Sequence, residues 1–140
     1  MSGGEMTRRV RLVTGPPCAG KTTWAKQHAG PNTIVLDFDD FARVAGSPAR
    51  WNHRREHRDA AEGLMLDAML DVAEATDGDW IVIRTAADPI DRAELAAWLH
   101  AELVVLCPPY EVLAARAAQR NGPRALNGIR HWLALNPEHG

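Results

Sequence analysis

The chain of 140 residues has few cysteines, no long apolar run and little net charge, and each shortage excludes a class of protein. Two cysteines, Cys18 and Cys107, are too few for a disulfide framework, so both are expected to be free thiols in a reducing cytosol. No apolar run approaches the length of a membrane span, and residues 1–6 lack the apolar core of a signal peptide. A formal charge of −2 gives no general attraction to nucleic acid, so such binding needs a local basic patch. We therefore expect a cytoplasmic protein with no membrane partner.

Composition and the order of apolar segments predict one α/β domain. Hydrophobic residues make up 46% of the chain and charged residues 24%, which suits a soluble domain with its own core. Four apolar segments alternate with helical patterns, and this order is typical of a parallel sheet with helices on both faces. Residues 1–7 are expected to be a disordered tail ahead of a single domain over residues 8–140. The predicted strands are Val10–Thr14, Thr33–Asp37, Trp80–Arg84 and Leu103–Cys107.

Helical patterns follow every predicted strand. Ser47-Pro48 is a helix-start signal, and apolar residues recur at helical spacing after it. Asp88-Pro89 provides a second start, with the acid as the N-cap and proline in the first turn. The predicted helices cover residues 22–29, 47–76, a segment opening at 88–89, residues 110–120, and a last segment that carries Ile129, Trp132 and Leu133.

The segment from Gly15 to Thr22 matches the phosphate-binding template G-x-x-x-x-G-K-[ST] at every fixed position. A predicted strand precedes it and a predicted helix follows, which argues against an ordinary glycine turn before a helix. In such a loop the backbone N–H groups accept phosphate oxygens, Lys21 reaches the β and γ phosphates, and the Thr22 hydroxyl can bind Mg²⁺. The sequence therefore predicts binding of ATP with Mg²⁺. The residues expected to hold the nucleotide are Gly15, Pro16, Pro17, Cys18, Ala19, Gly20, Lys21, Thr22 and Thr23.

Three acids follow the second predicted strand, namely Asp37, Asp39 and Asp40. The carboxyl ends of parallel strands share one edge of the sheet, so these acids are expected near the γ-phosphate. A carboxylate there can take a proton from an attacking hydroxyl or hold Mg²⁺ through water, and Asp37 is the candidate for the metal. The alternative is a helix N-cap cluster, which needs only one or two acids.

The segment Arg50–Arg58 is the one dense basic patch of the sequence. Its arginines, with Arg54 and Arg55 at the centre, could bind polynucleotide phosphates, and Trp51 could stack on a base. The alternative is a solvated helix face, which most charge runs are. His53 and His57 lie four residues apart, as two metal ligands on one helix face would, but no third ligand is evident.

Arginines also recur late in the chain, at positions 116, 120 and 124. Three arginines on one edge, interrupted by Asn121-Gly122-Pro123, suit a lid that closes over the triphosphate and neutralises the transferring phosphoryl group. Arg124 lies beyond the break and is expected to contribute least. The alternative is helix solvation with a favourable dipole interaction. Arg84, at the end of the third strand, is expected to contact substrate phosphate, to pair with Asp37 or Asp39, or to be structural.

With these residues placed, the chain resembles the kinase domain of phage polynucleotide 5′-kinases, within the P-loop phosphotransferases. The likeness is closest over Gly15–Lys26. It implies a P-loop kinase-like domain of about four parallel strands, flanked by helices, with a C-terminal helical lid. It also implies that Asp39, followed by Asp40 and an aromatic residue, is the general base, and that Arg116 and Arg120 are the lid arginines.

The residues expected to contact the phosphoryl acceptor differ from those of that family at two positions. The family has an arginine just after the aromatic residue, where this chain has Ala42 followed by Arg43. The family also has an acid at the end of the third strand, where this chain has Arg84. The chain is similar, in addition, to P-loop modules that phage proteins carry ahead of an HNH nuclease, and the missing nuclease suits an excised or stand-alone module.

Three functions remain open on the sequence. The first is an ATP-dependent kinase that phosphorylates the 5′-hydroxyl of DNA or RNA. The second is a kinase for a nucleoside, a nucleotide or a modified base, and the third is a nucleotide-binding module without transfer chemistry. The oligomeric state stays open. The residues expected to bind the acceptor are Asp40, Arg43, Arg54, Arg55 and Arg84.

Overall fold

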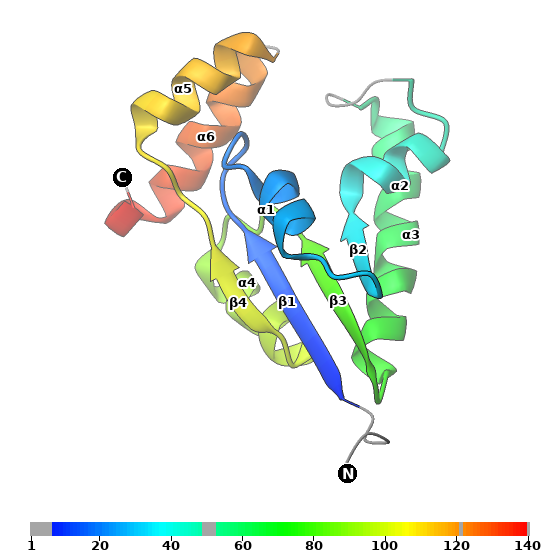
Figure 1. Ribbon diagram of the computed structural model, residues 1–140. Coiled ribbons are helices and arrows are strands. Elements are labelled where there is room, and N and C mark those ends of the chain that lie inside the picture. The colour runs from blue at the N-terminus through cyan, green and yellow to red at the C-terminus, as the bar shows by residue number, and fades with distance from the viewer. Residues whose placement is uncertain (1–6, 49–52, 121, 140) are drawn as a thin grey trace.

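A four-stranded parallel sheet lies at the centre of the computed structural model, which describes residues 7–48, 53–120 and 122–139. The strands run in the order β2-β3-β1-β4, and every neighbouring pair is parallel (Figure 1). This confirms the predicted α/β class. The tail expected over residues 1–7 lies, except for Thr7, outside the described residues. The strands are β1 (Arg8–Thr14), β2 (Thr33–Asp37), β3 (Gly78–Ile83) and β4 (Glu102–Val105).

Six α-helices and a short 3₁₀ turn complete the described residues. The predicted helix over 47–76 is wrong at its start, because α3 begins only at Arg55 and a separate short helix, α2, follows β2 directly. Asp37 begins α2 by accepting a hydrogen bond from the Asp39 backbone N–H. The helices are α1 (Lys21–His28), α2 (Phe38–Val44), α3 (Arg55–Glu74), α4 (Pro89–Leu99), α5 (Tyr110–Gln119) and α6 (Pro123–Leu135), with the 3₁₀ turn η1 at Pro137–His139.

The two faces of the sheet bury alternate side chains of the same strands. On one face Leu12 and Val82 pack with Met65 and Met69 of α3 and with Leu99 of α4. Residues of opposite parity, among them Val13 and Ile81, pack against α1 on the other face. This period of two is what a strand covered on both faces requires, and it explains the near-continuous apolar runs in the sequence.

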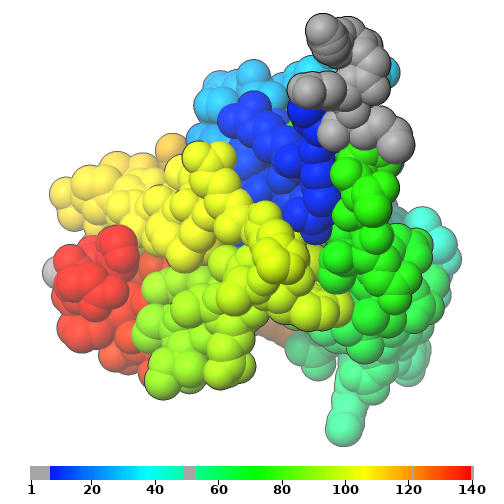
Figure 2. All heavy atoms as spheres, turned by 90° about the horizontal axis from the view of Figure 1, so that it is seen from below, coloured from blue at the N-terminus to red at the C-terminus, as the bar shows by residue number. Residues whose placement is uncertain are grey.

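The helices that follow the adjacent strands β1 and β3 lie on opposite faces of the sheet. Helix α1 follows β1 on one face, and α4 follows β3 on the other. In open parallel sheets a crevice forms at the carboxyl ends of such strands. Figure 1 shows α5 and α6 standing above this edge on one side and α2 with the start of α3 on the other. Figure 2 shows the opposite end, where β1 lies between α3 and the α4–β4 region.

The antiparallel pair α5–α6, here called the helical hairpin, packs on the loop between β1 and α1. Cys18 and Ala19 of that loop share a buried cluster with Leu113 and Ile129 of the hairpin. At Gly128 of α6 an added Cβ would lie 2.9 Å from a ring carbon of Pro17, so glycine permits this close approach. Within the described ranges, no helix is long and apolar enough to span a bilayer.

Candidate active site

The Gly15–Thr22 loop has the backbone geometry of a phosphate cradle. A Cβ at Gly15 would lie 2.2 Å from the carbonyl oxygen of Leu106, and Gly20 has a φ of +91°, so both positions require glycine. The turn is closed by a hydrogen bond from the Ala19 N–H to the Pro16 carbonyl, at 3.2 Å. No side chain caps the N-terminus of α1, which leaves its first N–H groups and its positive dipole end for an anion.

Lys21 extends back along this loop. Its ammonium Nζ donates to the carbonyl oxygens of Gly15 and Pro16, each at 2.8 Å. Withdrawal from water, and next the positive charge of Arg120, lower the pKa of Lys21 to about 8. The charges of Asp37 and Asp39 act against this lowering, and the phosphates of a nucleotide would further favour the charged form of Lys21.

Asp37 joins the end of β2 to the phosphate loop. Its Oδ2 accepts from the Thr22 hydroxyl at 3.0 Å, and its Oδ1 accepts from the Asp39 N–H at 3.1 Å. Burial raises the pKa of Asp37, although these two hydrogen bonds act against the rise. The hydroxyl and the carboxylate are hard oxygen donors of the kind that Mg²⁺ binds together with phosphates and water. In the described part of the chain, no three His, Cys, Asp or Glu residues gather as a metal cluster.

The other two acids have different partners. Asp39 Oδ1 lies 2.7 Å from Nε2 of the buried His53, and the Asp39 side chain is 35% exposed. Asp40 forms an exposed ion pair with Arg43 one turn further along α2. The N-cap alternative is thus met by Asp37, while Asp39 lies in the cavity wall with one oxygen engaged.

His53 precedes α3 and does not share a helix face with His57. In the sequence it was considered as part of the basic patch and as half of a metal pair, and this geometry does not support the metal pair. Its second ring nitrogen, Nδ1, lies 2.6 Å from the Ser47 hydroxyl. No local signal pointed to the contact with Asp39, because it joins residues from two elements across a chain reversal.

Arg84 pairs with Glu62 of α3, not with Asp37 or Asp39. Its two terminal nitrogens lie 3.2 and 3.4 Å from the Glu62 carboxylate oxygens. Both residues line the same cavity as the phosphate loop. Glu62 was missed in the sequence because it is one of many charged residues on a long, half-solvated helix.

The arginines of the helical hairpin divide between two positions. Arg116 donates to the Cys18 carbonyl at 2.9 Å and so braces the outer side of the phosphate loop. Arg120 lines the cavity, and its charge acts on Lys21. Arg124 was expected to contribute least, yet it also lines the cavity, because the first turn of α6 carries it and lies beside the end of α5 at the tip of the hairpin (Figure 1).

The described part of the basic patch, residues 53–58, does not line the cavity. Arg54 and Arg55 are exposed at the start of α3, and Arg55 lies 3.9 Å from Asp59. Neither lines the cavity. Three residues of the predicted patch, Arg50, Trp51 and Asn52, lie outside the described residues.

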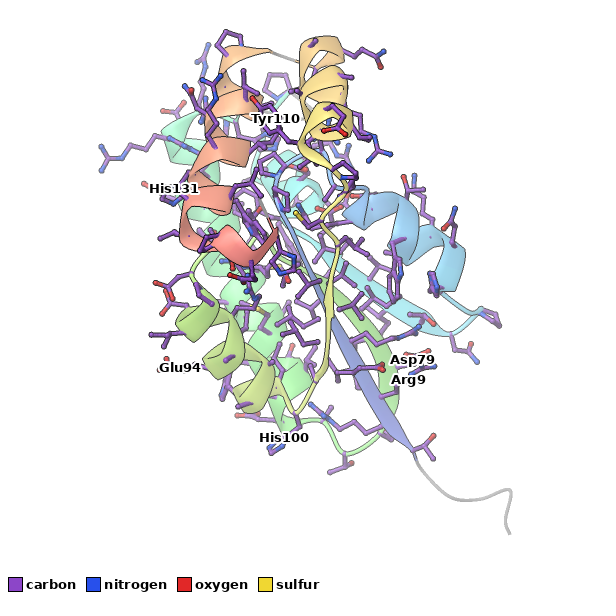
Figure 3. All side chains as sticks on the ribbon, turned by 90° about the vertical axis from the view of Figure 1, so that its left-hand side faces the viewer. Arg9, Asp79, Glu94, His100, Tyr110 and His131 are labelled. Atoms are coloured by element: carbon purple, nitrogen blue, oxygen red, sulfur yellow. The ribbon has the colours of Figure 1, made fainter. Side chains whose placement is uncertain are left out.

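The site as a whole is a cavity of about 820 Å³ at the carboxyl edge of the sheet, a volume that suits a nucleotide with room for a second ligand. The phosphate loop forms its floor, α2 and α3 one wall, and the helical hairpin the other (Figure 1). Figure 3 shows Arg9, Asp79 and His100 toward the other end of the sheet, and Tyr110 at the start of α5 above it.

Comparison with known families agrees with this geometry. A family model described as an AAA domain matches residues 10–131. The chain belongs to this family. Its fold is that of a P-loop kinase-like AAA domain. No curated protein sequence gives a significant match.

Two solved structures share the fold of this AAA domain. One is a chain of the structure titled "Structure of the Pnkp1/Rnl/Hen1 RNA repair complex", with a TM-score of 0.69 and 11% identity over 100% of this chain. This chain spans 49% of that one, about half its length. The other is the tunicamycin resistance protein of Deinococcus radiodurans, with a TM-score of 0.53 and 20% identity over 88% of this chain and 80% of that chain.

Proposed function

We propose that this AAA domain is an ATP-dependent phosphotransferase whose acceptor is a hydroxyl group, most economically the 5′-hydroxyl of DNA or RNA. One observation carries the proposal: the phosphate loop, the Thr22–Asp37 contact and the Asp39 carboxylate line one cavity. A nucleotide binder without chemistry has no need of a partly exposed carboxylate in the same cavity as the phosphate loop. The fold likeness to a chain of an RNA repair complex supports a nucleic-acid acceptor.

In the proposed reaction the acceptor oxygen attacks the γ-phosphorus of ATP. A new oxygen–phosphorus bond forms, the bond to the β–γ bridging oxygen breaks, and ADP leaves. The proton of the acceptor hydroxyl passes to Asp39. Lys21 and Arg120 neutralise the charge that develops on the phosphoryl oxygens, which is where electrostatic stabilisation counts most.

Thr22 and Asp37 are the residues that would hold Mg²⁺. When bound, the ion supplies Lewis-acid neutralisation of the β and γ phosphate oxygens. The 3.0 Å contact between the two side chains keeps both oxygens at the mouth of the phosphate loop before any ligand arrives. The remaining work of the chain is to orient the acceptor and to exclude water.

The proposal is tested by a transfer assay with ATP labelled in the γ-phosphate. The purified protein is offered 5′-hydroxyl oligonucleotides of DNA and RNA, nucleosides and nucleotides in parallel reactions. We expect label on the oligonucleotides. Label on the small acceptors alone would show a small-molecule kinase, and ATP binding with no transfer to any acceptor would show a nucleotide-binding module.

The small-molecule alternative has an observation in its favour, since Arg54 and Arg55 do not line the cavity. If they track a nucleic-acid backbone outside it, replacing both by alanine should weaken oligonucleotide binding. It should also flatten the log–log salt slope by about 1 to 1.5, because each phosphate contact on a single strand contributes about 0.7. Binding titrations at several salt concentrations measure this. The matched control replaces two exposed arginines elsewhere, Arg9 and Arg130, and an unchanged slope in the Arg54/Arg55 variant would favour the small-molecule kinase.

Nucleotide binding should depend on pH through Lys21. Its pKa of about 8 in the free protein means that the ammonium loses its charge as the pH rises through that value. Phosphates favour the charged form, so the apparent affinity for ATP should fall by about tenfold between pH 7 and pH 9. Calorimetric titrations across this range measure the effect. Lys21→Met should bind weakly with little pH dependence, and an equally steep dependence in that variant would assign the titration to another group.

The hairpin arginines should separate transfer from nucleotide affinity. Arg120→Ala should lower turnover by roughly ten- to a thousand-fold with little change in ATP affinity, because its charge acts on the developing phosphoryl charge. Arg116→Ala should lower turnover too, but with a loss of ATP affinity, since Arg116 braces the loop at the Cys18 carbonyl. Steady-state kinetics and direct binding distinguish the two patterns. The exposed Arg130 provides the control, and an Arg120→Ala variant with normal turnover would contradict this role.

A further inference from the structure

His53 is buried directly behind the site wall, in contact with the wall residue Asp39. Its side chain is 3% exposed, and both ring nitrogens are engaged, Nε2 with Asp39 Oδ1 at 2.7 Å and Nδ1 with the Ser47 hydroxyl at 2.6 Å. The ring of Phe38 lies against it, with centroids 6.3 Å apart and planes tilted by 59°. The imidazole is thus held from three directions and has one orientation open to it.

The hydrogen-bond directions follow from the partners. An ionised carboxylate can only accept, so Nε2–H of His53 donates to Asp39. In the neutral ring with that tautomer, Nδ1 accepts from the Ser47 hydroxyl. Ser47 is in turn held to the end of α2, because its N–H donates to the Ala42 carbonyl at 3.0 Å. A continuous chain of hydrogen bonds therefore runs from the backbone of α2 through Ser47 and His53 to the carboxylate.

Asp39 differs from its acidic neighbours Asp37 and Asp40 in that one of its carboxylate oxygens accepts no hydrogen bond from the described residues. Both oxygens of Asp37 accept hydrogen bonds, and Asp40 forms an exposed pair with Arg43, a kind of contact that restrains a side chain weakly. Among the described residues, the hydrogen bonds of Asp39 use Oδ1 and leave Oδ2 without a partner. A buried donor on one oxygen fixes the plane of the carboxylate and presents the other oxygen for an incoming proton.

We propose that His53 is a positioning residue for the phosphoryl transfer, orienting the Asp39 carboxylate so that Oδ2 receives the proton of the acceptor hydroxyl. The inference rests on the proposed function and names a residue of the same site. His53 touches neither the nucleotide cradle nor the acceptor side of the cavity wall, and it acts only through Asp39. A shift of about 1 Å in a reacting group can cost about a hundredfold in rate, which sets the scale of the effect.

Two substitutions of His53 each preserve one of its two hydrogen-bond contacts. The amide nitrogen of glutamine is as many bonds from Cα as Nε2, so His53→Gln keeps a donor for Asp39. The amide group of asparagine ends where Nδ1 lies, so His53→Asn keeps a partner for Ser47 and loses the contact with Asp39. Both substitutions remove the imidazole ring that packs against Phe38, so both variants lose the same packing contact. Their thermal unfolding temperatures should therefore be alike.

The test measures kcat, KM and ATP affinity in the transfer assay for the full chain. We expect His53→Asn to lower kcat by about 10- to 100-fold with ATP affinity unchanged, and His53→Gln to stay within about threefold of the wild type. The exposed His131, which Figure 3 shows on the outside of α6, supplies the matched control His131→Asn. Equal kcat in wild type and His53→Asn, or equal losses in the Asn and Gln variants, would overturn the inference while leaving the kinase proposal standing.

A double substitution separates positioning from a general structural role. In an Asp39→Asn background there is no base left to orient, so adding His53→Asn should lower the residual kcat by less than about twofold. A structural role predicts the same fold loss in both backgrounds and would overturn the inference. A wild type that transfers phosphate to no acceptor would overturn the proposed function itself, and the inference with it.

Discussion

Replacing Lys21 by alanine is expected to abolish phosphoryl transfer, with turnover lower by two or more orders of magnitude. The reason is that Lys21 brings a positive charge to the phosphates at a site withdrawn from water, where electrostatic stabilisation is strongest. The fold should survive, because the hydrogen bonds of the Lys21 ammonium to the described residues go to the Gly15 and Pro16 carbonyls of its own loop. Turnover in the labelled-phosphate assay, with thermal unfolding alongside, measures both expectations.

The matched control is Lys26→Ala, which removes a lysine from the same helix and the same cavity lining at a greater distance from the loop. It should leave turnover within a few fold of the wild type. Near wild-type turnover in Lys21→Ala would contradict the phosphotransferase proposal altogether. Loss of thermal stability in Lys21→Ala, at normal stability of Lys26→Ala, would instead show that the lysine supports the loop.

The fold was predictable because its signals are local. Each strand is a short apolar segment, and the phosphate loop is a contiguous motif. The edge rule for parallel sheets predicted acids near the phosphate loop, and Asp37 Oδ2 lies 3.0 Å from the Thr22 hydroxyl. The start of the long helix was not predictable in the same way. Helix α2 has seven residues, and the sequence offered site chemistry and a helix N-cap as alternatives for the acids at its start. Asp37 serves as both, since it is the N-cap of α2 and the partner of Thr22.

The partners that complete the site depend on tertiary structure. Glu62 reaches Arg84 only because α3 packs along β2 and β3, and His53 reaches Asp39 only because the chain reverses between α2 and α3. Arg124 lines the cavity with Arg120 because the first turn of α6 lies beside the end of α5. No periodicity or spacing in the sequence encodes these arrangements, so sequence reasoning could name wall residues such as Asp39 and Arg120 but not the partners His53 and Glu62.

The substitution Asp39→Asn should lower turnover by about a hundred- to ten-thousandfold while the affinity for ATP changes little. The amide has the same shape as the carboxylate, and its oxygen can still accept from Nε2 of His53, but it cannot take the proton of the acceptor hydroxyl. The effect should therefore appear in kcat, with ATP affinity preserved. Steady-state kinetics with a 5′-hydroxyl oligonucleotide, and separate titration of ATP binding, measure the two quantities.

Asp37→Asn is the informative comparison, because Asp37 lies two residues earlier and both its oxygens are engaged by Thr22 and by the Asp39 N–H. Its loss should weaken Mg²⁺-dependent ATP binding and the start of α2, and these defects should be partly relieved by higher Mg²⁺ concentration. Asp39→Asn should not respond to Mg²⁺, since its defect lies in proton transfer. A crippled Asp37→Asn that Mg²⁺ does not relieve, beside a fully active Asp39→Asn, would assign the base to Asp37 and move the correspondence with the polynucleotide kinases by two residues.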